Sequence, residues 1–178
     1  PSLSLPVRHP GGVGQDWGVD AIVTPAEMGA IDAAAPEPVE VLIGRAGGAV
    51  ARAALDLLGG SYGRRVVVVA GKGNNGNDGR EAARRLTSRG VRCHVIDAAD
   101  APDVLPAADL VIDAAYGTGF TGTYHSPRPA DPATPVLAVD IPSGVDGLTG
   151  VAAGHPLVAD VTVTFAAWKP GLLLADGA

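Results

Sequence analysis

The chain has 178 residues with a formal net charge of −6, 47% hydrophobic residues and 18% charged residues. This length suits one domain with a substantial core, and the composition is typical of a globular α/β protein. The acidic balance argues against nucleic acid as a partner, because binding nucleic acid requires a basic face. No apolar run reaches the roughly 20 residues of a membrane helix, which argues against a membrane partner.

The N-terminal segment and the single cysteine bear on organisation and location. Residues 1–20 are rich in proline and glycine, so we expect a flexible arm there and a single domain over residues 21–178. The arm lacks the apolar core of a secretion signal. Cys93 has no possible partner for an internal disulfide, and a cytoplasmic location is therefore expected.

Two helices are expected ahead of the first strand. Thr24, Pro25 and Glu27 have the spacing of a capping box with proline at the first helical position, which predicts a helix through Ala34. Residues 39–58 carry apolar side chains at helical spacing and are followed by two glycines, which predicts a second, longer helix.

The stretch VVVVAGKGNNGND, residues 66–78, organises the rest of the chain. Its apolar start predicts a strand buried on both faces, and its glycines match G-x-G-x-x-G. A helix is expected over residues 78–89, with Asp78 as its N-cap and a solvated face of arginines. The glycine pattern, with Asp97 about 20 residues after Gly76, favours an NAD-dependent dehydrogenase.

The polar residues among these glycines argue against a dehydrogenase. An ionised Asp78 near the start of the helix would repel a pyrophosphate. Amide oxygens from Asn74, Asn75 and Asn77, together with this carboxylate, suit a hydroxyl-rich ligand or a hard cation.

Four further strands are expected at residues 91–96, 108–113, 136–140 and 160–165. Strands that alternate with helices or crossovers predict a three-layer αβα sandwich with a Rossmann-like, mostly parallel sheet. The link between Phe120 and Val136 is rich in proline, and we expect no helix in it.

Polar groups follow three of these strands: residues 74–78, Asp113 with a glycine-rich loop, and Asp140 with Ser143. Ligands in such sheets bind beyond the carboxyl ends of the strands, which indicates a functional site here. Clustered carboxyl groups raise one another's pKa, so that one can stay protonated near neutral pH and act as an acid. The histidines lack zinc-ligand spacing and are expected to be structural or exposed: His9, His94, His125 and His155.

Four segments carry a resemblance to a known family: GKGNNGNDG (71–79), DAAYGTGFTG (113–122), DIPSGVDGLTG (140–150) and VTVTFAAWKPG (161–171). In this order they resemble the motifs of the NAD(P)H-hydrate epimerases, the YjeF N-terminal domain family. The resemblance implies an isomerase that interconverts the R and S epimers at C6 of the hydrated cofactors NADHX and NADPHX. A separate ADP- or ATP-dependent dehydratase would then restore the cofactor.

The resemblance also implies which residues form the site. The hydrate would be bound by Asn74, Asn75, Gly76, Asn77, Asp78, Gly117, Thr118, Gly119, Phe120, Thr121, Gly122, Thr123 and Asp140. A potassium ion (K⁺) would be held by Asn75, Asp113 and Ser143. We hypothesise that a carboxyl group, Asp140 ahead of Asp113, assists departure of the C6 hydroxyl before water adds from the other face.

The sequence departs from the family pattern at one position. Asn77 replaces the second glycine of the family's usual NNGGDG, and asparagine tolerates positive φ better than most residues.

A non-catalytic, dimeric binding module is the main alternative, since the same domain serves as a scaffold in an mRNA-decapping enhancer family and an animal relative is named for binding an apolipoprotein. Retention of Asp113, Asp140 and Ser143 favours the enzyme; the dehydrogenase is third. Relatives dimerise, so a homodimer formed through the N-terminal helices is expected.

Overall fold

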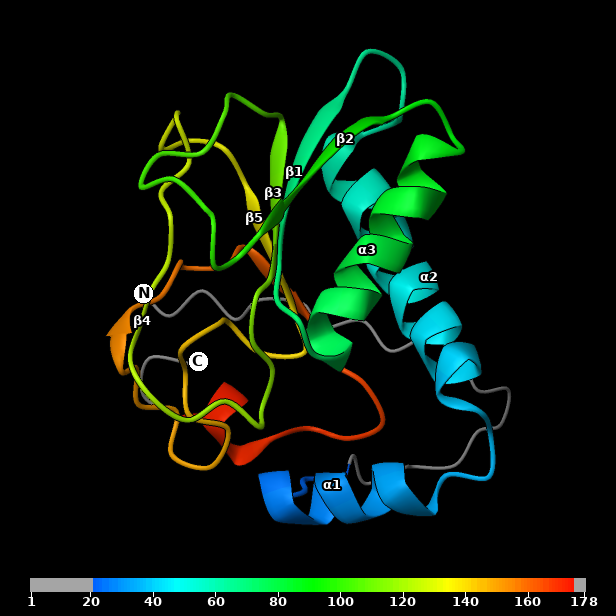
Figure 1. The fold of residues 1–178 in the computed structure, drawn as a ribbon, viewed down its shortest axis with the longest axis vertical. Coiled ribbons are helices and arrows are strands. Elements are labelled where there is room, and N and C mark those ends of the chain that lie inside the picture. Colours follow the sequence, from blue (N-terminus) through cyan, green and yellow to red (C-terminus); the bar gives the residue numbers. More distant parts are fainter. Residues whose placement is uncertain (1–20, 175–178) are drawn as a thin grey trace.

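Five parallel strands form the central sheet of the computed structural model, which describes residues 21–174 (Figure 1). The arm expected at residues 1–20 lies outside the described residues. The strands are β1 (Arg65–Ala70), β2 (Arg92–Asp97), β3 (Leu110–Ala114), β5 (Val136–Val139) and β7 (Val161–Val163). Their order is β2-β1-β3-β5-β7, and every neighbouring pair is parallel. The order reverses between β1 and β3, and such a switch point leaves a crevice at the carboxyl ends of the strands.

The helices expected before β1 are confirmed as α1 (Pro25–Ala34) and α2 (Val39–Leu58). The capping box of α1 forms as predicted: the Thr24 hydroxyl accepts from the Glu27 amide, and the Glu27 carboxylate accepts from the Thr24 amide. Helix α2 ends at Gly59, whose φ of 65° is left-handed and suits glycine. Within residues 21–174 no helix combines the length and the apolar character needed to cross a membrane.

Helix α3 (Asn74–Thr87) begins four residues earlier than the sequence suggests. Gly73 is its N-cap and offers no side chain, so the expected capping role of Asp78 is wrong. The polar residues therefore form the first turns of a helix rather than a loop. Close approach to the backbone fixes this geometry, because a Cβ on Gly76 would lie 1.8 Å from the carbonyl oxygen of Gly71.

The two faces of the sheet are covered differently. Figure 1 shows α2 and α3 together on one face, where they pack on Val66 and Val68 of β1. Val67 and Val69 point to the other face, as alternation along a strand requires, and contact residues such as Leu105. The α/β class and the parallel sheet are confirmed. In the described part of the chain, the layer on this second face is made of irregular segments rather than helices.

The proline-rich link crosses this second face, and it contains no helix, as expected. Its only strand, β4 (Tyr124–His125), pairs in parallel with β6 (Gly154–His155), outside the central sheet. The last element in the described part of the chain is the 3₁₀ helix η1 (Pro170–Leu172), which lies near α1 in Figure 1. The backbone of Val23 donates to the carbonyl of Trp168 at 2.8 Å, so the segments before α1 and after β7 run side by side.

Candidate active site

A cavity of about 1120 Å³ opens at the carboxyl ends of the strands. Its walls are the segments that follow β1, β3, β5 and β7, closed by α1 and α2. The predicted ligand-binding residues that line it are Asn74, Asn75, Asp78, Gly117, Thr118, Gly119, Phe120, Thr121 and Asp140. The remaining predicted site residues do not line it: Gly76, Asn77, Asp113, Gly122, Thr123 and Ser143. The structure therefore brings the three expected strand ends together around one cavity.

Asp140 follows β5 and lies in the cavity wall with its carboxylate fully engaged. Its Oδ1 accepts from Lys169 Nζ at 2.5 Å and from the Thr164 hydroxyl at 3.3 Å. Its Oδ2 accepts from the amide and the hydroxyl of Thr118 at 3.4 and 3.3 Å. The backbone of Asp140 has a φ of 67°, which is rare for a residue other than glycine and frequent at functional sites.

Lys169 is the functional residue that sequence reasoning missed. It lines the cavity, is 1% exposed, and donates to Asp140, to the Thr164 hydroxyl at 2.8 Å and to the Phe165 carbonyl at 3.0 Å. Lysine is almost never fully buried without a partner. A lone lysine in the apolar segment AAWKPG after the last strand was the available signal.

Asp113 and Ser143 form a buried pair behind the cavity. The Ser143 hydroxyl donates to Asp113 Oδ1 at 2.6 Å and the Ser143 amide to Oδ2 at 2.9 Å. The two residues are 2% and 0% exposed. Burial raises the pKa of Asp113, and the hydrogen bonds from Ser143 oppose that shift.

Asn75 carries a buried side-chain amide whose nitrogen and oxygen have no hydrogen-bond partner. It lies in the first turn of α3, against Gly117, where an added Cβ would be 3.4 Å from the Asn75 amide carbon. The preceding residue, Tyr116, donates its backbone N–H to the Ser143 hydroxyl at 2.9 Å. Asn75, Ser143 and Asp113 are thus gathered around the start of one loop. Since buried polar groups are normally paired, the Asn75 amide points to a missing ligand.

Asp78 faces the same cavity from α3 and is 9% exposed. Its carboxyl group makes no hydrogen bond or ion pair with any residue between 21 and 174. Burial raises its pKa from 3.8 to about 7, and repulsion from Asp140 and Asp32 adds to this shift. Burial, with a smaller contribution from the clustering of carboxyl groups expected from the sequence, thus raises the pKa of Asp78 far enough for it to hold a proton near neutral pH.

Asp97, the acid expected to bind ribose in a dehydrogenase, does not line the cavity. It forms an ion pair with Arg80 at 3.6 Å, and Arg80 also donates to the Gly71 carbonyl. Arg80 therefore stabilises the end of β1 through these contacts, whereas the sequence predicted that it would be solvated.

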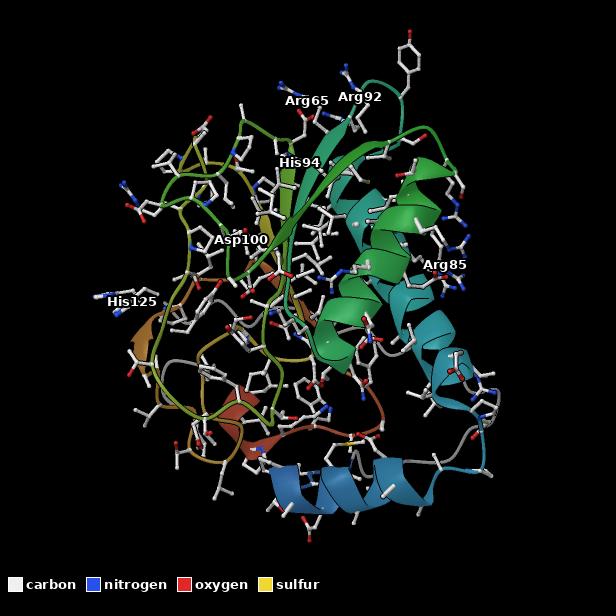
Figure 2. All side chains as sticks on the ribbon, viewed as in Figure 1. Arg65, Arg85, Arg92, His94, Asp100 and His125 are labelled. Carbon is white, nitrogen blue, oxygen red and sulfur yellow. The ribbon has the colours of Figure 1, made fainter. Side chains whose placement is uncertain are left out.

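The basic residues and histidines labelled in Figure 2 lie away from the cavity. Arg65 and Arg92 begin β1 and β2, at the amino ends of these strands, and His125 lies on the side of the molecule far from α2 and α3. The exposed His125 and His155 contact each other through Nδ1 atoms 2.8 Å apart. Among the described residues, no cluster of three or more histidine, cysteine or acidic side chains is arranged to hold a metal ion.

Comparison with known proteins decides the family. The protein-family model described as "YjeF-related protein N-terminus" matches residues 39–104 and 96–171 of this sequence. The chain belongs to the YjeF N-terminal domain family.

Several YjeF relatives carry informative names. The NAD(P)H-hydrate epimerase of Limosilactobacillus fermentum is 38% identical, over 64% of this chain and 69% of the relative. The NAD(P)H-hydrate epimerase of Leuconostoc mesenteroides is 35% identical, over 88% of this chain and 85% of the relative. The bifunctional NAD(P)H-hydrate repair enzyme Nnr of Thermofilum pendens is 36% identical, but this chain spans only 33% of its length.

A solved structure supports the fold. The crystal structure of yeast ynu0, YNL200c, matches with a TM-score of 0.69 over 86% of this chain and 83% of the yeast chain, at 21% identity. That likeness establishes that the YjeF N-terminal domain here has the same architecture as the yeast protein.

Proposed function

We propose that this YjeF-family protein is an NAD(P)H-hydrate epimerase, an isomerase that interconverts the R and S epimers of NADHX and NADPHX. The observation that carries the proposal is the convergence of Asn74, Asp78 and Asp140 on one large cavity at the switch point. Curated relatives with 35–38% identity bear this name. Carboxyl and amide groups at that place suit a substrate whose reacting centre is a hydroxyl.

The cavity also offers a wall suited to a planar ring. Tyr116 and Phe120 both line it, with ring centroids 4.1 Å apart and an angle of 32° between the ring planes. Asp140 lies on the same cavity and would contact the hydrate directly. Asp113 does not line the cavity, so its contribution would pass through Ser143 rather than through contact with the substrate. The reaction needs loss of the C6 hydroxyl and return of water to the other face, for which a carboxyl group is a suitable acid.

We further propose that Asn75, Asp113 and Ser143 bind a potassium ion. The donor set fits a hard monovalent cation, since amide, hydroxyl and carboxylate oxygens are its preferred ligands. The unpartnered amide of Asn75 supports this assignment. A bound cation would supply positive charge beside the buried Asp113 carboxyl group, which has no basic partner among the described residues.

The partner proteins follow from the proposed reaction. Epimerisation alone does not regenerate the cofactor, so a dehydratase that uses ADP or ATP and acts on the S epimer would work with this protein in the cytoplasm. The bifunctional relatives are named as repair enzymes in a single chain. A homodimer is supported by Ile31, Val39 and Val41, three apolar side chains 41–45% exposed on α1 and the start of α2.

The test of the function uses purified R-NADHX, potassium and an S-specific dehydratase, with NADH recovery as the readout. Recovery faster than spontaneous epimerisation allows, proportional to the amount of this protein, is the expected result. No acceleration by the folded protein would overturn the epimerase and favour the non-catalytic scaffold. Repeating the assay with R-NADPHX compares the two cofactors.

A further inference from the structure

Three carboxyl groups gather at the carboxyl end of the sheet, and they differ in what surrounds them. Asp113 is 2% exposed, accepts hydrogen bonds on both oxygens and does not line the cavity. A proton on Asp113 could not reach a ligand in the cavity without breaking the pair with Ser143. Asp113 is therefore not placed to protonate a substrate directly, which leaves Asp78 and Asp140 as the acids that line the cavity.

The carboxylate of Asp140 has hydrogen-bond partners on both of its oxygens. One oxygen accepts from the Lys169 ammonium and the Thr164 hydroxyl, and the other from the amide and hydroxyl of Thr118. Its Oδ1 lies 2.5 Å from the Lys169 Nζ, and charge-assisted hydrogen bonds of this kind are strong, so the position of the carboxylate is fixed. Among non-glycine residues of the described chain only Asp140 and Ala166 have positive φ: Asp140 is bound by Lys169, and Ala166 follows Phe165, whose carbonyl Lys169 also binds. Backbone strain gathered around one buried lysine indicates that the position of this carboxylate matters.

Asp78 has the opposite environment. It projects from α3 into the cavity without any hydrogen bond or ion pair to described residues, and helix packing withdraws it from water. Asp140 and Asp32 repel its charged form. The other charged groups around the same cavity are Glu37 and Arg45, which pair with each other at 2.8 Å, Lys72 on the loop after β1, and Lys169, which is engaged by Asp140. No lysine or arginine side chain among residues 21–174 pairs with Asp78, and burial and neighbouring carboxyl groups raise its pKa, so it is the group suited to supply a proton.

Resting on the proposed epimerase reaction, we propose that Asp78 is the catalytic acid that protonates the departing C6 hydroxyl, while the Asp140 carboxylate, paired with Lys169, lies beside the ring. The C6–O bond breaks with its electron pair on oxygen, which takes the Asp78 proton and leaves as water. The ring nitrogen lone pair forms the C6=N bond, and the Asp140 carboxylate stabilises the resulting cation. Water then adds to the opposite face and releases one proton, which restores the Asp78 carboxyl group. No net proton, electron or further reactant is consumed.

In this scheme Lys169 is a positioning residue. It does not transfer the proton; it fixes the orientation of Asp140 by donating to Oδ1, whereas Thr118 donates to Oδ2. The two carboxyl groups thus have different roles, because Asp140 is held by Lys169 whereas Asp78 has no hydrogen-bond or ion-pair partner among the described residues.

The test compares Asp78→Asn with wild type in the coupled assay with R-NADHX. Asparagine keeps the size of the side chain but has no carboxyl proton. We expect kcat to fall about 10²- to 10⁴-fold, the usual contribution of a general acid, with KM changed less than about threefold. Wild-type activity in the same experiment establishes the epimerase independently, so a failure of Asp78→Asn to lower kcat overturns only the role of Asp78.

Asp32→Asn is the matched control, because Asp32 lines the same cavity and raises the pKa of Asp78 through its charge. The loss of its activity at high pH should occur at lower pH than in wild type, since Asp78 then ionises more readily. If circular dichroism shows that Asp78→Asn does not fold, Asp32→Asn alone tests whether Asp78 is the catalytic acid. A high-pH limb that does not move in Asp32→Asn, or a wild-type rate that does not fall above about pH 7, overturns the proposal.

Discussion

Lys169 and Asp140 form an ion pair of 2.5 Å whose side chains are only 1% and 15% exposed. The lysine comes from the segment after β7, and the aspartate follows β5, so the pair joins two neighbouring strand ends beneath the cavity. Removal of one partner leaves the other charge buried without compensation, which typically costs about 3–5 kcal/mol. We predict a loss of this size in the free energy of unfolding for Lys169→Met, measured by urea denaturation.

Arg45→Met supplies the control for this substitution, since it breaks the Arg45–Glu37 pair whose side chains are 66% and 35% exposed. Exposed pairs contribute about 0–1 kcal/mol. Equal losses in the two variants would contradict a special role for the buried pair.

Ser143→Ala tests the proposed potassium site. The Ser143 hydroxyl donates to Asp113 and accepts from the Tyr116 amide, so its removal leaves two buried groups without that partner. We expect about 1–3 kcal/mol of destabilisation and a higher potassium concentration for half-maximal activity. Ser126→Ala is the control, because Ser126 lies beside the second, smaller cavity near His125 and should leave the potassium dependence unchanged. An identical potassium response in both variants would remove Ser143 from the ligand set.

The glycines of the fingerprint have separable roles. A Cβ on Gly76 would lie 1.8 Å from the Gly71 carbonyl oxygen, whereas a Cβ on Gly73 would meet nothing within 4 Å. Forced overpacking costs about 1–3 kcal/mol or more. Gly76→Ala should therefore lower the midpoint of thermal unfolding by several degrees, while Gly73→Ala, at a φ of −86°, should leave it nearly unchanged. Equal midpoints for the two variants would mean that the backbone at Gly76 can move.

The sequence predicted elements where one local signal dominates. The apolar period of residues 39–58 and the capping box at Thr24 gave helices with nearly the observed bounds, and the run of valines gave β1. The start of α3 was misjudged because NNGND has no apolar period and its N-cap, Gly73, has no side chain to signal it. What fixes this helix is a contact with the Gly71 carbonyl, and no local pattern records such a contact.

The sequence predicted where the candidate site lies, but not which side chains contact one another within it. The three polar strand ends were identified, since parallel strands bring their carboxyl ends to one edge. The partners of Asp140 and Asp78 depend on strand order and on a lysine 29 residues away from Asp140, which a linear reading does not connect. The sequence left open whether Asn77 requires a backbone with positive φ. In the described chain only Asp140 and Ala166 have positive φ among non-glycine residues, so Asn77 needs no left-handed backbone. Asn77 lies within α3, where a side chain needs no special backbone conformation.

The protonation of Asp78 leads to a prediction for stability against pH. Its folded pKa of about 7 lies above the ordinary value of 3.8. Between these two values the folded chain keeps a proton that the unfolded chain has lost, so this group makes the free energy of unfolding fall as pH rises, by about 1.4 kcal/mol per pH unit. Below pH 3.8 the stabilising contribution of Asp78 is fully present, and above about pH 7 this contribution is gone.

Asp78→Asn removes this dependence while leaving the other titrating groups in place. Asp113, whose pKa is also raised, and Glu81, whose pKa is lowered to about 2 by its bonds to Arg84 and Arg85, contribute to both proteins and cancel in the difference. The stability of Asp78→Asn relative to wild type should therefore rise steadily from about pH 4 to pH 7 and become constant above that, as measured by urea denaturation at half-unit intervals of pH. A difference that is independent of pH across this range would mean that Asp78 is ionised in the folded protein, and such an Asp78 could not serve as the acid at neutral pH.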